Sequence, residues 1–166
     1  MKYVYIDSGT TNSRLYLAED KEVVSVRMLG VGTVDNVAPD SRKLESCLWE
    51  AYGEMLQEQG LADCEIDGIY MSGMATSKNG ICEVDFLPVP IDIKRYADEI
   101  HMHKTECFGR EVGFLTGIVD RPGVEGKLDN VELFHNVRGE EIELFGIMEE
   151  WDELFCQKKG AVIMPG

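Results

Sequence analysis

The sequence is short of basic residues, with 16 Lys and Arg against 31 Asp and Glu and a formal net charge of −15. Such a charge repels the phosphates of nucleic acids and of anionic lipids, and the basic residues form no cluster along the chain. We therefore expect neither nucleic acid nor a membrane as a partner. A small phosphorylated ligand remains compatible with this charge, because backbone N–H groups, one or two cations and Mg²⁺ can hold it.

Long hydrophobic runs are also missing. No run approaches the roughly 20 residues of a membrane-spanning helix, and the N-terminus lacks the basic-then-apolar pattern of a secretion signal. The five cysteines are odd in number and have no C-x-x-C spacing that would indicate zinc or redox chemistry. We therefore expect reduced thiols in a cytoplasmic protein.

What the sequence does contain is a series of short apolar segments of two kinds. Its 166 residues are 44% hydrophobic, enough for one domain with a real core. Alternating or apolar runs predict strands, and helical spacing predicts helices that end at Gly or Pro. The expected strands are 2–6, 13–17, 22–29, 66–71, 111–119 and 161–164, and the expected helices run from 40 or 41 to 59, 92–101 and 139–155.

This order predicts an α/β fold. Three strands in close succession form an antiparallel meander, and the later strands alternate with helices, which favours parallel pairing. We expect a mixed five-stranded sheet with helices on both faces.

The opening stretch "YIDSGTTNSRLYL" carries the main functional signal. Its turn, Ser8-Gly9-Thr10-Thr11-Asn12, would expose several N–H groups and hydroxyls in one concavity that suits phosphate oxygens. Asp7 precedes the turn and could hold Mg²⁺ directly or through water. A plain Gly-containing hairpin with a capping Asp explains the same composition, so the residues alone leave both interpretations open.

The motif "IDSGTTNSRLYL" resembles the first phosphate motif of the sugar kinase, heat-shock protein and actin superfamily. The resemblance implies a ribonuclease-H-like, actin-like ATPase lobe in which Gly9, Thr10, Thr11 and Asn12 bind ATP phosphates and Asp7 takes part in catalysis with Mg²⁺.

Three further stretches resemble the 2-keto-3-deoxygalactonate kinase family: "MSGMATSKNGICEVDFLPVP", "VRGEEIELFG" and the closing "AVIMPG". The resemblance implies transfer of the ATP γ-phosphate to the terminal 6-hydroxyl of a keto-deoxy sugar acid. Glu143 and Lys78 depart from it, since the family commonly has Gln and Arg there. Arg and Lys differ because only Arg has a planar fork for carboxylates.

The resemblance also covers only the N-terminal part of that family, whose members are roughly twice as long. It implies that residues 1–160 form the N-terminal lobe and that 161–166 begin the first strand of a second lobe, which would complete the ATP site. On this basis we expect the isolated chain to be inactive. An exposed lobe interface with a lone strand edge would favour self-association.

Several residues are candidates for the sugar-acid site. Glu140 follows Gly139 at the start of a predicted helix and matches the acidic position of related kinases, so it is the candidate base; its alternative is a Glu favoured by the helix dipole. Arg138 could pair with the substrate carboxylate, or lie on the surface. Loop residues that follow a strand end are the remaining candidates, with a solvated loop as the alternative: Ser72, Gly73, Ser77 and Lys78.

His101 and His103 are expected at the end of a helix, where they would point to different sides. That placement favours surface histidines over metal ligands.

Two rival functions remain open from the sequence. The chain could serve a kinase for another small sugar or acid, or it could be a non-catalytic module that binds a sugar acid.

Overall fold

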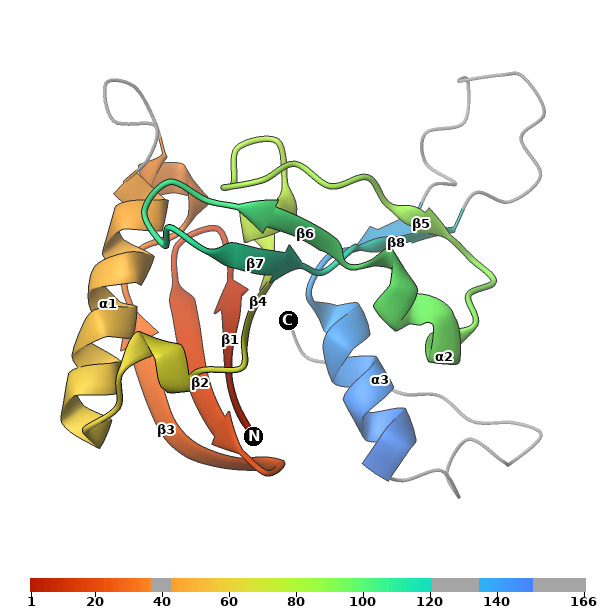
Figure 1. Ribbon diagram of the computed structural model, residues 1–166. Helices are drawn as coiled ribbons and strands as arrows, with labels where there is room; N and C mark the ends of the chain where they lie inside the picture. Colours follow the sequence, from red (N-terminus) through yellow and green to blue (C-terminus); the bar gives the residue numbers. More distant parts are fainter. Residues whose placement is uncertain (37–42, 121–134, 151–166) are drawn as a thin grey trace.

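The computed structural model describes residues 1–36, 43–120 and 135–150 (Figure 1). The chain opens with a meander of β1 (Lys2–Ser8), β2 (Ser13–Glu19) and β3 (Glu22–Leu29). Asp20 and Lys21 connect β2 to β3 with positive φ angles of 49° and 77°, the conformation that a two-residue hairpin turn requires. Val4, Ile6, Leu15 and Leu17 alternate with more exposed residues, so these strands bury one face. The predicted meander is confirmed.

The helix α1 (Lys43–Gln59) covers the buried face of the meander. Its apolar residues recur every three or four positions and are almost fully buried, in the core cluster that also holds the β1 and β2 side chains. They are Leu44, Leu48, Ala51, Tyr52, Met55 and Leu56. The predicted helix is confirmed from residue 43 onward, whereas its expected start at residue 40 or 41 lies outside the described residues.

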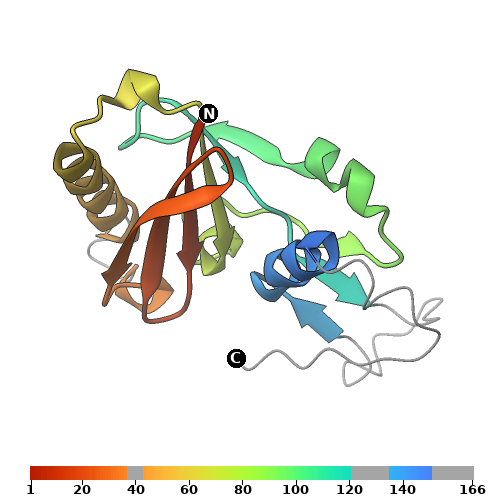
Figure 2. The ribbon, with the colours of Figure 1, turned by 90° about the horizontal axis from the view of Figure 1, so that it is seen from below.

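The main sheet has six strands in the order β3-β2-β1-β4-β7-β6. The strands β4 (Gly68–Gly73) and β7 (Glu111–Phe114) continue the sheet in parallel with β1, and β6 (His101–Lys104) closes it antiparallel to β7. The mixed α/β sheet with a meander and parallel strands is therefore confirmed, with six strands instead of five. Figure 2 shows α1 and α3 (Glu140–Glu150) on opposite sides of the meander.

The predicted helix over 92–101 is confirmed only in part. The segment forms a single turn, α2 (Ile93–Tyr96), followed by a 3₁₀ turn (Ala97–Glu99) and then the strand β6. A helix that continued would place Asp98 and Glu99 near the negative end of its dipole, and pairing with β7 offers the backbone a ladder instead. His101 and His103 therefore lie on a strand and point to the same side, contrary to our expectation.

The predicted strand over 111–119 is divided between two sheets. β7 ends at Phe114, and β8 (Ile118–Asp120) belongs to a second sheet with the order β5-β8-β9, where β5 is Leu87–Pro88 and β9 is His135–Val137. Gly117 lies between the two strands, where a Cβ would come within 2.8 Å of both the Phe86 ring and the Val137 carbonyl oxygen. The apolar run is therefore divided at Gly117, where the backbone passes close to neighbouring groups. The apolar pattern of the sequence does not reveal such a contact.

The helix α3 follows β9 directly and confirms the predicted helix for residues 140–150. Tyr96 packs edge-on against Phe145 of α3 at a ring distance of 4.9 Å, which links the α2 turn to this helix. The rest of the predicted helix, the strand at 161–164 and the proposed division after residue 160 lie outside the described residues. Within residues 1–36, 43–120 and 135–150, no helix is long and apolar enough to cross a membrane.

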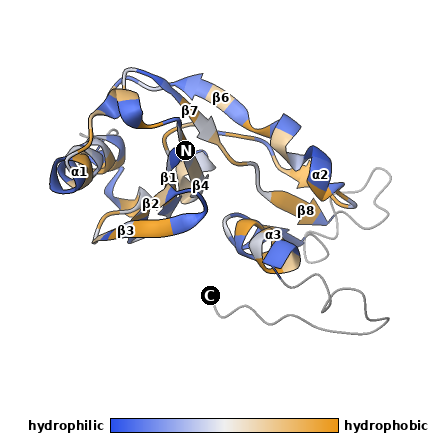
Figure 3. Ribbon diagram, turned by 60° about the horizontal axis from the view of Figure 1, so that its bottom comes forward, coloured by the Kyte–Doolittle hydropathy of each residue, from blue (hydrophilic) through white to orange (hydrophobic). Residues whose placement is uncertain are grey.

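The edge strand β3 presents apolar side chains to solvent. Arg27 donates hydrogen bonds to Glu54 and to Glu58 of α1, and Leu29 packs against the core, so these alternate residues at the end of the strand face the helix. Val26 and Met28 point the other way and are 53% and 67% exposed, and Val24, at the irregularity in the pairing with β2, is 46% exposed. Figure 3 shows this strand largely in the colour of hydrophobic residues.

Candidate functional site

Three segments that are far apart in the sequence meet at the carboxyl ends of β1 and β4. Asp7 lies near the end of β1, in register with Ser72 of β4. A Cβ on Gly73 would lie 2.5 Å from the Ser8 carbonyl oxygen and 3.0 Å from Asp7 Oδ1, and a Cβ on Gly139 would lie 3.3 Å from Gly73 Cα. Glycine at 73 and 139 therefore lets the β4 end and the start of α3 approach Asp7.

The turn between β1 and β2 lies beside this junction, and backbone hydrogen bonds fix its conformation. The Gly9 N–H donates to the Asn12 carbonyl (2.7 Å), and the Val34 N–H donates to the Thr10 carbonyl (3.0 Å). Thr10, Thr11 and Asn12 are exposed. Among the described residues, no hydrogen bond takes the backbone N–H of Thr10 or Thr11. The turn is thus a fixed loop with outward N–H groups and hydroxyls, as phosphate binding requires.

Buried hydroxyls brace the strand ends beneath the turn. The Ser13 hydroxyl lies 3.0 Å from Ser8 Oγ and 2.8 Å from the Val31 carbonyl oxygen, and both serines are fully buried. Because a buried hydroxyl without a partner would cost free energy, these bonds hold the two strands in one register. In the sequence, this bracing is indicated only by the two serines that flank the Gly-Thr-Thr-Asn turn.

Asp7 is half-buried at the end of β1, and its pKa is raised from its ordinary value. Burial raises the pKa of Asp7, the positive charge of Arg14 opposes that rise, and the negative charge of Glu140 adds to it. The ionised form is thus short of positive charge, which a bound divalent cation would supply. One such carboxylate together with ligand phosphates is a common Mg²⁺ site, so the residues present fit this ion.

Glu140 and Glu141 begin α3 and have different surroundings. Glu140 is exposed and accepts the Arg138 backbone N–H at 3.2 Å. Glu141 is 1% exposed, and its Oε2 accepts the Gly139 N–H at 2.6 Å. Its Oε1 has no hydrogen-bond partner within the part of the chain that is described. Burial raises the pKa of Glu141 to about 7.

Sequence reasoning selected Glu140 and missed Glu141. The two residues are adjacent and chemically identical, and only the packing of α3 shows which one is buried. The only feature of the sequence that could have indicated Glu141 was the pair of Glu residues after Gly139.

Arg138 reaches away from Glu140 into the loop after β4. Its Nη1 donates to the Thr76 carbonyl (2.6 Å), its Nη2 donates to the Val84 carbonyl (3.0 Å), and its guanidinium lies 4.0 Å from the centre of the Phe86 ring. Burial lowers the pKa of Arg138. The guanidinium thus ties the start of α3 to the loop, and its expected pairing with a substrate carboxylate stays a prediction.

The remaining candidates divide into two groups. Ser72 is buried at the junction and shares a short hydrogen bond with the Tyr5 hydroxyl, and Gly73 touches the Asp7 side chain. Ser77 donates to the Met74 carbonyl at 2.7 Å, and Lys78 is exposed on the same loop. The structure therefore brings Ser72 and Gly73 to Asp7, whereas Ser77 and Lys78 follow the 3₁₀ turn Met74–Thr76 (η3).

The meander that runs into parallel strands, with a Gly-Thr-Thr-Asn turn and an Asp at their ends, defines the class of the molecule: it is a lobe of the actin-like ATPase fold. Residues 7–166 match the family described as 2-keto-3-deoxy-galactonokinase. The chain belongs to this family, whose members are ATP-dependent kinases.

One solved structure supports the fold. A protein from Sinorhizobium meliloti, provisionally assigned as a 2-dehydro-3-deoxygalactonokinase, matches with a TM-score of 0.65 and 21% identity over 89% of this chain. The match covers 43% of that protein, so this chain spans less than half its length. Because the sequence identity is low, this match shows the fold alone.

The activator of 2-hydroxyisocaproyl-CoA dehydratase from Clostridium difficile, solved with bound ADPNP, matches at a TM-score of 0.31. The identity is 23%, and the match covers 44% of this chain and 24% of that one. This likeness is too weak to argue from. No curated protein matches the sequence.

Proposed function

We propose that this chain supplies the phosphate hairpin and part of the sugar-acid site of a kinase that phosphorylates the terminal 6-hydroxyl of 2-keto-3-deoxygalactonate. One observation carries the proposal: Asp7, Gly73 and Gly139 converge beside a turn whose Thr10 and Thr11 N–H groups have no partner among the described residues. Membership of the kinase family supports the reaction class.

In this proposal the turn Gly9-Thr10-Thr11-Asn12 holds phosphate oxygens of ATP. Backbone hydrogen bonds to Asn12 and from Val34 already fix the backbone of the turn, so binding of the nucleotide would cost little further ordering. Asp7 holds Mg²⁺ directly or through water. The ion, when bound, neutralises charge on the phosphates during transfer.

Glu140 acts as the base. As the sugar-acid oxygen forms its bond to the γ-phosphorus, the bond from that phosphorus to the bridging oxygen of ADP breaks, and the hydroxyl proton passes to the Glu140 carboxylate. The exposure of Glu140 and its Coulombic effect on Asp7 support this role, because the base must lie near the transferred phosphate.

The sugar acid itself would lie over the ends of β4 and α3. Ser72 and Gly73 form the floor there, and Arg138 positions the loop that carries Ser77 and Lys78. Lys78 and Arg138 are the cations we assign to the substrate carboxylate, in keeping with the prediction from sequence. A second lobe would complete the ATP site, so we expect the isolated chain to be catalytically inactive and the complete enzyme to work in the cytoplasm.

The test is calorimetric binding of Mg·ATP to the chain and to its Asp7→Asn variant. We expect the variant to bind at least about 10-fold more weakly, because the exchange removes the carboxylate that holds the cation. Asp98→Asn is the matched control, since Asp98 is exposed on the 3₁₀ turn after α2. Equal affinity in Asp7→Asn and Asp98→Asn would contradict the phosphate site.

Titration with 2-keto-3-deoxygalactonate and with galactose separates the substrate classes. Preference for the sugar acid supports the proposal, and preference for the neutral sugar would redirect it to another sugar kinase. Sugar-acid binding without any response to Mg·ATP would favour a non-catalytic binding module.

A further inference from the structure

A second cluster of reactive side chains lies outside the Asp7 site. β6 places His101 and His103 two residues apart on one side of an edge strand, while Met102 and Lys104 alternate with them. The two imidazole rings are stacked, with centres 6.1 Å apart and planes inclined by 17°. Both histidines are exposed, so their ring nitrogens are accessible from solvent.

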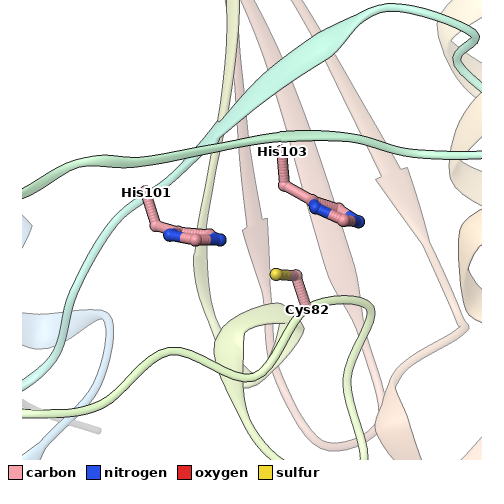
Figure 4. Close-up of side chains that lie close together, drawn as sticks. All are labelled: Cys82, His101 and His103. Carbon is pink, nitrogen blue, oxygen red and sulfur yellow. The ribbon is translucent and has the colours of Figure 1, made fainter.

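Cys82 faces these two rings from the loop that follows the η3 turn (Figure 4). Backbone hydrogen bonds fix this loop, since the Ile81 and Cys82 N–H groups donate to the Ala75 carbonyl at 2.8 and 3.2 Å. Gly80 allows the arrangement because a Cβ there would collide with the Ala75 carbonyl. The half-buried thiol is therefore held in place across from the strand.

We propose that Cys82, His101 and His103 form a binding site for a borderline-soft divalent metal ion, with Zn²⁺ as the best fit. One sulfur and two imidazole nitrogens lie within 4.8 Å of one another. Zn²⁺ bonds thiolate at about 2.3 Å and imidazole at about 2.0–2.1 Å, so its ligand atoms lie somewhat closer together than this. Rotation of the two exposed imidazoles closes the difference, and a water molecule fills the fourth tetrahedral position.

The chemistry of the donors selects the metal. A thiolate and two imidazoles suit Zn²⁺ and disfavour Mg²⁺ or Ca²⁺, which take oxygen ligands. Acidic residues around the site favour a cation: Glu83 adjoins Cys82, and Glu83, Asp85, Asp98, Glu99 and His101 line a cavity of about 470 Å³. This cavity gives the ion a path from solvent to His101.

Binding of the ion would connect the loop that carries Cys82 to the strand β6. The loop that carries Cys82 also offers the Val84 carbonyl to Arg138, and β6 is the outermost strand of the main sheet. The ion would thus clip the sheet edge to the loop that Arg138 holds. On binding, the S–H bond of Cys82 breaks, a sulfur–metal bond forms and the proton passes to the buffer. The site does not depend on the proposed kinase function.

The test is metal binding to the reduced, tag-free chain, measured by competition with a chromophoric chelator for Zn²⁺ and by absorption with Co²⁺. We expect one Zn²⁺ per chain, and Co²⁺ spectra with a sulfur-to-metal charge-transfer band. Cys82→Ser, His101→Ala and His103→Ala should each lower the affinity at least about 10-fold, since loss of even an outer-shell partner costs 10–100-fold.

Two matched controls use residues of the same kind elsewhere in the chain. Cys64→Ser removes an exposed thiol and His135→Ala removes the third histidine, and both should leave the affinity unchanged. Both site histidines are exposed, so their variants should keep the circular dichroism spectrum of the parent chain. The proposal is overturned if folded His101→Ala and His103→Ala bind Zn²⁺ as tightly as the parent, or if Co²⁺ shows no sulfur band.

Discussion

Among single residues, Gly73 combines a positive φ angle with close backbone neighbours at the candidate site. Its φ is +67°, and a Cβ would lie 2.5 Å from the backbone carbonyl oxygen of Ser8. Its ψ of −143° places it in a region open essentially to glycine alone, so Gly73→Ala combines a backbone strain of about 1–3 kcal/mol with an overlap that the backbone must relieve. We expect a loss of about 3 kcal/mol in unfolding free energy. Urea denaturation measures it.

Gly60→Ala is the control for this prediction. Gly60 has nearly the same φ, +66°, yet nothing lies within 4 Å of the position of its Cβ. It should lose only about 1 kcal/mol, the strain alone. Equal losses in the two variants would mean that the contact between the β4 end and Ser8 is loose.

Some residues of the candidate site could be predicted from the sequence and others could not. The turn after Asp7 could be predicted because Gly, Thr and Asn between two short strands form a local motif, and its binding of phosphate stays a prediction. Glu141, Gly139 and the bracing by Thr76 and Val84 could not be predicted, since each depends on α3 coming to rest against the β4 loop, a contact between residues more than 50 positions apart.

At the scale of elements, the start of α3 makes stability depend on pH. The folded pKa of Glu141, about 7, lies above the ordinary value of 4.5, so the buried carboxyl is favourable when protonated and costly when charged. The contribution of this carboxyl to stability is full below about pH 4.5 and is lost as the pH rises to about 7.

Glu141→Gln should remove that dependence, because an amide stays neutral. Relative to the variant, the unfolding free energy of the parent chain should fall by about 3 kcal/mol at most between pH 4.5 and 7, and then stay level. Urea titrations at several pH values measure the difference. Glu143→Gln, at an exposed position on the same helix, is the control. A flat difference for Glu141→Gln would show that the carboxylate gains a compensating partner.

The elements that were predicted wrongly share one cause. The apolar run 111–119 and the segment 92–101 carry enough local signal for one strand and one helix. The β7 edge, however, pairs with β6, and Gly117 lets the chain pass beside Phe86 into the second sheet. Pairing between strands outweighed the propensity of the single segment in both places.

At the scale of the whole molecule, the exposed face of β3 favours association. Val24, Val26 and Met28 form an apolar stripe on an edge strand, and such strands pair readily with one another. We expect the apparent mass in light scattering to rise with concentration. The double variant Val26→Lys with Met28→Lys should suppress the rise, because association through this strand would then have to bury charged side chains.

Ile93→Lys serves as the control for association, since Ile93 is exposed on α2 and away from β3. A parent chain that stays monomeric across the whole concentration range would contradict the prediction. Suppression by Ile93→Lys to the same degree would show that the β3 stripe does not govern association.

The sequence by itself determined the features that depend on near neighbours: the meander, the amphipathic α1 and the Gly-Thr-Thr-Asn turn, together with the family to which the chain belongs. Short-range spacing and turn chemistry suffice for these, because strands and helices repeat every two or 3.6 residues. The tertiary structure alone decided which glutamate of α3 is buried, where Arg138 reaches, and that Cys82 faces His101 and His103. Those outcomes depend on packing between distant segments, whose geometry no local pattern encodes.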